Sequence, residues 1–369
     1  MAGRIFCFLC LCGLTFTASG QDNAAKPFLW EARNGQTTVY LLGSVHELRP
    51  GDHPLHPLME DACERSDQVA FELDLDEAKS ASVLLLGLQK GTYSPPDNLA
   101  AHLSQETYDR VVQYAQANGI RFYDLYRPWF LSQVLTTKEL SHAGFEANLG
   151  IDKHFFDLAK DRGKTIKALE SASFQINVLA SLPEEKLIAS VEKFLADPAL
   201  AVSQVVQVVE AWKRGDGEAL RRAIENEFRD DPQSFDLLLT QRNQNWLPAI
   251  EGFLKENRTT VVVVGAAHLV GETGLVTLLR RKGYDVEQLP RATVATPPRF
   301  KAIERLLGSE LRLTLEVESG QRYGLQTSSD LERWANVLDF VATGSTQVVT
   351  NDVPLNASAV FFRIAKPQL

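Results

Sequence analysis

The sequence contains little cysteine, which limits how the fold can be held together. Four of the 369 residues are cysteines, and three lie within the first 20 residues: Cys7, Cys10 and Cys12. Cys63 is the only cysteine in the rest of the chain, so that part cannot form an internal disulfide bond. We expect Cys63 to be a small buried residue on a helix, and the fold to depend on its hydrophobic core.

Several well-known motifs are also missing. The sequence has no His-Glu-x-x-His, the helix motif of many zinc proteases, and no Gly-x-Ser-x-Gly, the nucleophile turn of serine hydrolases. It has no glycine-rich phosphate loop of the Walker type. Its 38 basic and 47 acidic residues give a net charge of −9, which disfavours a nucleic-acid partner because phosphates attract basic surfaces.

Long apolar runs are scarce beyond the amino terminus. The first 20 residues, MAGRIFCFLCLCGLTFTASG, place one arginine before an apolar run and end in small residues, which is typical of a cleavable secretory signal. The run is too short for a typical membrane span, although an uncleaved anchor is the alternative. We expect cleavage near Gly20, a periplasmic or secreted protein, and no transmembrane segment in the mature chain.

The rest of the chain divides by pattern into three parts. Residues 21–292 alternate strand-like and helix-like segments and are expected to form the main domain. Residues 293–308, which follow Pro290 and contain Pro297 and Pro298, are expected to be a linker. Residues 309–369 consist of short alternating runs between Gly, Ser and Asn turns, which predicts a small all-β, sandwich-like module.

The main domain is predicted to be α/β with a mainly parallel sheet. Two strand-like runs flank Asn34-Gly35, the strongest short hairpin signal. A helix and the buried-looking run QVAFEL follow, which is the strand-helix-strand order of a parallel sheet. Residues 76–250 are mostly helical in pattern, so we expect a large helical insertion. The run VVVV at residues 261–264 suits a strand that is covered on both faces.

Two apolar strands end in the same short motif. VYLLGSVH contains Gly43 and His46, and VVVVGAAH contains Gly265 and His268. A glycine lets the chain turn sharply, and in open α/β sheets ligands bind beyond the carboxyl ends of the strands. Because parallel strands end at the same edge, the two histidines are predicted to face one crevice.

Two carboxylates occupy equivalent positions, since Glu72 and Glu170 each follow another predicted strand. Two imidazoles and a carboxylate form a typical shell for a divalent metal ion, which would activate water while a free carboxylate takes its proton. The alternative is structural: one or both histidines hydrogen-bond the backbone at a tight turn or cap the helix that follows.

Several of these segments together resemble a known family. The sequences PFLWEARNGQTTVYLLGSVHEL, GIDKHFFDLAKDRGKTIKALES, QRNQNWLPAI and VVVVGAAHLVGETGLVTLLRRKGYDVEQL occur in the order seen in the TraB/GumN family of the Tiki-like metalloprotease superfamily. The resemblance covers residues 27–290 and leaves out the carboxy-terminal module. It implies a Tiki- or erythromycin-esterase-like fold and metal-dependent hydrolysis of a peptide or protein.

The resemblance also implies roles for particular residues. The expected ligands of a divalent metal ion (Mn, Co or Zn) are His46, His268 and Glu72, and the turn glycines are Gly43 and Gly265. The expected catalytic residues are a general base, Glu72 or Glu170, and a pair that orients the substrate, Arg242 and Asn243. Asp152, in the family's Gly-x-Asp motif, is a secondary candidate.

Structural roles are open for three of these residues. Asp152 could cap its helix, Glu170 could pair with a lysine, and Arg242 could brace the helical insertion through a salt bridge. A second function is also open, because relatives in the superfamily include haem-binding and pheromone-shutdown proteins. The same cleft would then hold a peptide or haem without any chemistry.

Overall fold

The computed structural model describes residues 26–289, 298–306, 310–317, 322–342, 346–352 and 360–365. The chain divides into two compact units, Met1–Pro290 and Arg291–Leu369, which are described separately below. The signal segment predicted for residues 1–20 lies outside the described residues.

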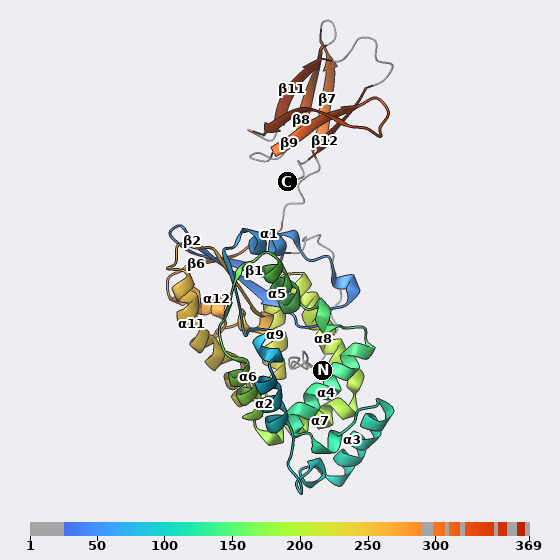
Figure 1. The fold of residues 1–369 in the computed structure, drawn as a ribbon, viewed down its shortest axis with the longest axis vertical. Coiled ribbons are helices and arrows are strands. Elements are labelled where there is room, and N and C mark those ends of the chain that lie inside the picture. The colour runs from blue at the N-terminus through green and yellow to red at the C-terminus, as the bar shows by residue number, and fades with distance from the viewer. Residues whose placement is uncertain are drawn as a thin grey trace. The chain divides into compact units, whose positions relative to one another are not determined.

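The first unit contains a six-stranded sheet (Figure 1). Its strands are β1 (Leu29–Asn34), β2 (Thr37–Ser44), β3 (Gln68–Phe71), β4 (Thr165–Ala168), β5 (Thr260–Gly265) and β6 (Asp285–Gln288). The order is β4-β3-β5-β2-β1-β6, with the first four of these parallel and β1 antiparallel to both of its neighbours. The sheet is therefore mainly parallel, as the strand-helix-strand pattern predicts.

Local sequence explains two of these strands. The turn between β1 and β2 contains Gly35 with φ 59°, a left-handed conformation that glycine adopts without strain. In β5 all four valines are fully buried, which requires cover on both faces of the sheet. Helix α5 supplies part of that cover, because it packs against β3, β4 and β5.

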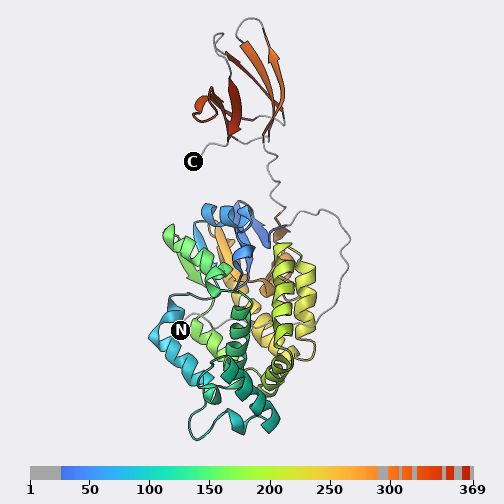
Figure 2. The same ribbon diagram turned by 90° about the vertical axis from the view of Figure 1, so that its right-hand side faces the viewer.

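Twelve helices connect the described strands of the first unit. They are α1 (Pro57–Arg65), α2 (Ala81–Gly91), α3 (Gln105–Ala117), α4 (Pro128–His142), α5 (Ile151–Asp161), α6 (Ala172–Ala180), α7 (Glu184–Ala196), α8 (Pro198–Lys213), α9 (Gly217–Glu227), α10 (Pro232–Phe235), α11 (Gln241–Phe253) and α12 (Leu275–Arg281). Most of them lie between β3 and β5 in the chain, which is the predicted helical insertion. Figures 1 and 2 show α3 at the end of this unit opposite the strands.

Several helices of the insertion begin at a side-chain cap. Ser80, Ser104 and Ser171 each accept a hydrogen bond from the backbone N–H three residues further on, at the starts of α2, α3 and α6.

Among the described residues, no single helix is long and apolar enough to cross a membrane; α7 and α8 reach that length and composition only as a pair bent by 101°.

The helix α11 follows a short π-helical segment, η6 (Asp236–Thr240). Such wider turns are rare and often occur at functional sites. Thr240 and Gln241 both keep right-handed helical backbone angles, so α11 continues directly from η6. The second and third residues of α11, Arg242 and Asn243, are buried.

The second unit consists of two three-stranded antiparallel sheets. Its strands are β7 (Arg299–Arg305), β8 (Glu310–Glu316), β9 (Arg322–Ser328), β10 (Ala335–Val341), β11 (Thr346–Asp352) and β12 (Phe361–Ala365). The sheet orders are β10-β9-β12 and β11-β8-β7. One apolar cluster joins both sheets, with Leu313 and Leu315 from β8 and Tyr323 and Leu325 from β9 fully buried. The predicted all-β module is therefore present.

The predicted linker is wrong over part of its length. Within residues 293–308, the segment Arg299–Arg305 is strand β7, which pairs with β8. Phe300 packs against the apolar cluster of this unit, which explains why a segment preceded by prolines joins the sheet. The prolines Pro297 and Pro298 therefore precede the module's first strand.

Candidate functional site

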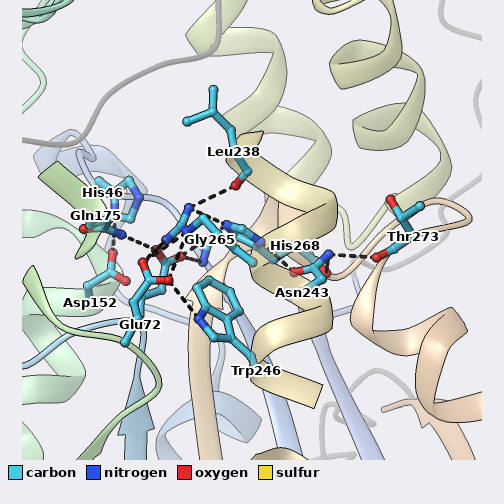
Figure 3. Close-up of polar contacts among 12 residues, drawn as sticks. His46, Glu72, Asp152, Gln175, Leu238, Asn243, Trp246, Gly265, His268 and Thr273 are labelled. Carbon is cyan, nitrogen blue, oxygen red and sulfur yellow. Dashed lines mark hydrogen bonds and ion pairs between the residues drawn. The ribbon is translucent and has the colours of Figure 1, made fainter. Parts of the chain in front are cut away.

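Neighbouring strands carry the two histidines to one edge of the sheet. β2 and β5 are parallel, and their last residues, Ser44 and Gly265, are paired in register. His46 follows β2 by two residues, and His268 ends a short 3-10 turn after β5. The two Gly-x-x-His segments therefore leave the sheet side by side (Figure 3).

Gly43 makes close packing possible at the end of β2. A Cβ atom at this position would collide with the buried ring of Phe28. The carbonyl oxygen of Gly43 accepts a hydrogen bond of 2.7 Å from Nε1 of Trp212 in α8. This strand end is thus held by the core on one side and by the helical insertion on the other.

His46 is paired with Asp152, the secondary candidate. Nδ1 of His46 lies 2.6 Å from Oδ2 of Asp152, which is in the first turn of α5. Asp152 makes no capping bond, and the N-cap position of α5 is Gly150. Gly150 lies directly against the carbonyl of His46, where a Cβ atom would collide. The absence of a side chain at Gly150 lets α5 approach closely enough for Asp152 to reach the imidazole.

This pairing changes the acid–base properties of His46. Burial disfavours the charged imidazole, but the Asp152 carboxylate outweighs it and raises the pKa of His46 to about 9. With Nδ1–H donated to Asp152, the other nitrogen, Nε2, faces the centre of the site. It lies 3.9 Å from the point where a Cβ atom on Gly265 would be.

Glu72 is held by three hydrogen bonds. Its Oε1 accepts from the backbone N–H of Gly265 at 2.7 Å, and its Oε2 accepts from Nε2 of Gln175 at 2.9 Å and from Arg242 at 2.6 Å. Burial raises the pKa of this carboxyl, but Arg242 and the nearby histidines together lower it to about 2. Glu72 is therefore ionised at neutral pH and is a weak proton acceptor.

Arg242 is the centre of the network and is buried. Its five N–H groups all have acceptors: Nε donates to Glu170 at 3.1 Å, one terminal nitrogen to Glu72 and Glu170 at 2.6 and 2.7 Å, and the other to the Leu238 carbonyl and Nε2 of His268, both at 3.1 Å. All of its donors are thus bound to protein groups. In this conformation Arg242 positions other side chains, and a direct role in orienting substrate stays a prediction.

His268 is held as a neutral imidazole. A guanidinium can only donate, so Nε2 of His268 must accept from Arg242, and Nδ1 must carry the proton that is donated to Oδ1 of Asn243 at 2.7 Å. Burial lowers the pKa of His268 to about 3. Asn243 in turn donates to the carbonyl of Thr273 at 2.8 Å, so it fixes the His268 ring (Figure 3).

Glu170 completes the buried charge cluster. It pairs with Arg242, and Nε1 of Trp246 donates to its Oε2 at 2.9 Å. Burial raises the pKa of Glu170 above its ordinary value, against the effect of Arg242. The ion-pair partner of Glu170 is thus Arg242, and not a lysine as the structural alternative had it.

The residues predicted to bind metal are close together, but their arrangement does not fit a metal ion. Two imidazoles and one carboxylate are suitable donors. However, Arg242 donates to Nε2 of His268 and to Oε2 of Glu72, so its guanidinium is bound to two of the expected ligands. In the described part of the chain, no group of three or more His, Cys, Asp or Glu residues is arranged to hold a metal ion.

Two members of the network were not predicted from the sequence. Gln175 lies in α6 and binds Glu72, and Trp246 lies one helical turn after Arg242, with the guanidinium 4.7 Å from its ring centre. The spacing of four residues between Arg242 and Trp246 is a signal that could have identified the tryptophan. Gln175 offers no comparable local signal.

Substitution of Gly265 by alanine is expected to impair the site with little effect on folding. The backbone of Gly265 has φ −48°, which alanine adopts easily. Its Cβ atom, however, would lie 3.2 Å from Oε1 of Glu72 and 3.5 Å from Cδ2 of His268. We expect ligand binding or turnover to fall about tenfold or more, because small displacements of reacting groups are costly. Thermal unfolding and activity assays on one preparation would test this; an unchanged activity would contradict it.

Comparisons with known proteins show similarity over most of the first unit. The profile of the TraB/PrgY/gumN family matches residues 28–288. The uncharacterized protein YbaP of Escherichia coli (strain K12) is 26% identical over 255 residues, which cover 67% of this chain and 89% of YbaP. YbaP of Shigella flexneri gives the same identity and coverage.

A more distant relative has a descriptive name. A protein of Amphimedon queenslandica named metalloprotease TIKI homolog is 22% identical over 357 residues, which cover 80% of this chain and 68% of that protein. No solved structure matches the chain significantly.

Proposed function

The chain belongs to the TraB/PrgY/gumN family, and from this premise we propose that it is a hydrolase that cleaves peptide or related amide bonds outside the cytoplasm. The distant relative named as a metalloprotease supports the hydrolase class. The secretory pattern of residues 1–20 supports action outside the cytoplasm.

The pair formed by His46 and Asp152 is the observation on which this proposal rests. An imidazole whose one nitrogen is bound to a carboxylate and whose other nitrogen faces a cavity is a common general base. The 2.6 Å contact with Asp152 fixes the ring and its tautomer. His46 and Glu72 also line the two cavities of this site, of about 130 and 370 Å³.

In the proposed reaction, His46 transfers a proton from the attacking water to the departing amine. Its neutral Nε2 removes a proton from water as the water oxygen bonds to the carbonyl carbon of the substrate. The resulting imidazolium is stabilised by Asp152, and it donates the proton to the departing amine nitrogen as the C–N bond breaks. The products are a carboxylic acid and an amine, and His46 is regenerated.

The charge cluster around Arg242 serves as a rigid frame for this chemistry. Arg242 holds Glu72 and Glu170 in ionic contact, and Asn243 fixes the ring of His268. Rigid neighbours keep a catalytic group in its productive position. In this proposal Glu72, Glu170 and Asn243 are positioning residues.

Metal dependence stays a prediction, suggested by the name of the Amphimedon queenslandica relative. It would require Arg242 to move away from His268 and Glu72. The chemistry proposed above therefore uses only the side chains of this chain.

Digestion of a peptide library tests the proposal. The purified full chain is incubated with peptides of mixed sequence, with EDTA or with added Mn²⁺, Co²⁺ or Zn²⁺, and the products are identified by mass spectrometry. We expect cleavage that retains activity in EDTA. Activity that depends on one added metal would support hydrolysis but would overturn the metal-independent step. Tight binding of a peptide or haem without cleavage under any condition would favour the binding function instead.

A further inference from the structure

Two cavities meet at the proposed catalytic histidine. The smaller has a volume of about 130 Å³ and the larger about 370 Å³, and both are lined by His46, Glu47 and Glu72. From these shared residues the two cavities extend into different parts of the fold. His268 and Arg242 line the smaller cavity but not the larger one. A ligand that reaches His46 can therefore extend in two directions.

The walls of both cavities are mainly apolar. The smaller is bounded by side chains such as Val208 of α8 and Leu238 of η6. The larger is bounded by side chains such as Leu84 of α2 and Ile176 of α6. Such linings favour apolar groups of a ligand. The difference in volume favours a bulky group in the larger cavity and a small one in the other.

Three buried polar atoms in these walls have no hydrogen-bond partner within the described residues. They are Oγ of Ser44 and Oε1 of Gln133 in the smaller cavity, and Oε1 of Gln175 in the larger. All three side chains are almost completely buried. Buried polar groups normally have partners, because an unmade hydrogen bond is costly. The two glutamine oxygens are acceptors, and they match the N–H groups of a peptide.

We propose that the two cavities are subsites on either side of the bond that is hydrolysed beside His46, and that Ser44, Gln133 and Gln175 bind the amide groups of the substrate. The substrate class is a peptide with a bulky apolar side chain on one side of the cleaved bond and a small one on the other. This inference rests on the proposed function and specifies its substrate. Ser44 and Gln133 serve the small side, and Gln175 serves the bulky side.

The first test compares two buried glutamines. Gln133→Leu removes a buried oxygen that has no partner within the described residues, from a residue that lines the smaller cavity. Gln204→Leu is the matched control: both polar atoms of Gln204 are also buried and unpartnered within the described residues, but Gln204 lines neither cavity. We expect both variants to keep or raise the melting temperature. Only Gln133→Leu should raise KM, about fivefold, with kcat less affected.

A purely structural role for Gln133 predicts a different result. In that case Gln133→Leu would lower the melting temperature or would leave KM unchanged, and either outcome overturns the assignment. An equal rise in KM for Gln204→Leu would also overturn it.

The second test compares adjacent leucines of α2. Leu84 lines the larger cavity, whereas Leu85 is 56% exposed. The substrates are three internally quenched octapeptides with Phe-Ala, Ala-Phe or Phe-Phe at the cleaved bond. We expect either the Phe-Ala or the Ala-Phe peptide to be cleaved about tenfold faster than the other two peptides. Leu84→Trp should remove that preference by filling the larger cavity, and Leu85→Trp should keep it.

Binding measurements separate failure of this inference from failure of the proposed function. Fluorescein-labelled forms of the three peptides are titrated against the unmodified protein and against His46→Ala, with anisotropy as the readout. The same preference in binding, without cleavage, would support the subsites and overturn hydrolysis. Cleavage without preference, and with equal effects of Leu84→Trp and Leu85→Trp, would overturn the subsites and keep hydrolysis. Peptides that neither bind nor react overturn the subsites as well.

Discussion

Replacing Arg242 by leucine is expected to lower the free energy of unfolding by about 3–5 kcal/mol. Arg242 is only 4% exposed and forms ion pairs with both Glu72 and Glu170. Leucine leaves these two buried carboxylates without their shared cation, and neither can regain the solvation that it lost on burial. The change is measured by urea denaturation at neutral pH, followed by tryptophan fluorescence.

The pH dependence of this variant has a definite sign. Arg242 holds the pKa of Glu72 at about 2 in the intact protein. Without Arg242, burial raises the pKa of both carboxyls above the unfolded values, so their ionisation at neutral pH opposes folding. The Arg242→Leu variant should therefore regain stability as the pH falls and the carboxyls protonate. A further change of Glu72 and Glu170 to glutamine should recover part of the loss at neutral pH.

Arg221 is the matched control for this measurement. It also contacts two carboxylates, Glu218 and Glu225, but at the surface, with 31% of its side chain exposed. Surface ion pairs contribute about 0–1 kcal/mol, so Arg221→Leu should have little effect. Equal and small losses for the two arginine variants would show that the buried cluster does not stabilise the fold.

Replacing His46 by alanine is expected to lower kcat/KM by a factor of about 10² to 10⁴, the usual contribution of a general base. The side chain of His46 is 31% exposed, so the melting temperature should change much less than it does for Arg242→Leu. His102→Ala is the control, because His102 also contacts two carboxylates, Asp97 and Glu184, at the surface. Loss of activity in both variants, or in neither, would contradict the role of His46.

The pH profile identifies the role of His46 more closely. Burial lowers the pKa of His46, but Asp152 raises it to about 9, so the imidazole is mostly protonated at neutral pH. A base must be unprotonated, and kcat/KM should therefore rise with pH up to about 9. Asp152→Asn removes the charge that raises the pKa and should move this rise to lower pH, with a lower maximum rate. A rate that falls as the pH rises towards 9 would instead identify His46 as an acid.

The sheet could be predicted from the sequence because its signals are local. Asn34-Gly35 predicts the hairpin, and the four valines of β5 predict a strand buried on both faces. The two Gly-x-x-His segments predict a common edge because parallel strands end together. Each of these inferences needs only adjacent residues and the direction of a strand.

The surroundings of the histidines could not be predicted in the same way. Gln175 reaches Glu72 across 103 positions of sequence. Gln133 lines a cavity from α4, and its Oε1 has no hydrogen-bond partner among the described residues that would reveal its role. Such placements depend on how the helices of the insertion pack against one another. The donor set of His46, His268 and Glu72 indicated a metal ion. The family resemblance placed Arg242 in the same site, but nothing in the sequence indicates that it donates to His268 and Glu72 themselves.

The π-helical segment η6 determines where Arg242 points. Each residue of an α-helix turns the chain by about 100°, and a π-helical turn contains roughly one residue more than an α-helical turn. Loss of one residue from Asp236–Thr240 would return this stretch to regular α-helical phase and rotate everything after it by about 100° relative to α10. Either Arg242 would then leave Glu72 and Glu170, or α10 would have to turn instead. An insertion or deletion in η6 therefore changes the direction in which the Arg242 side chain points. Homologous chains with this charge cluster must preserve the number of residues in η6 as strictly as the arginine itself.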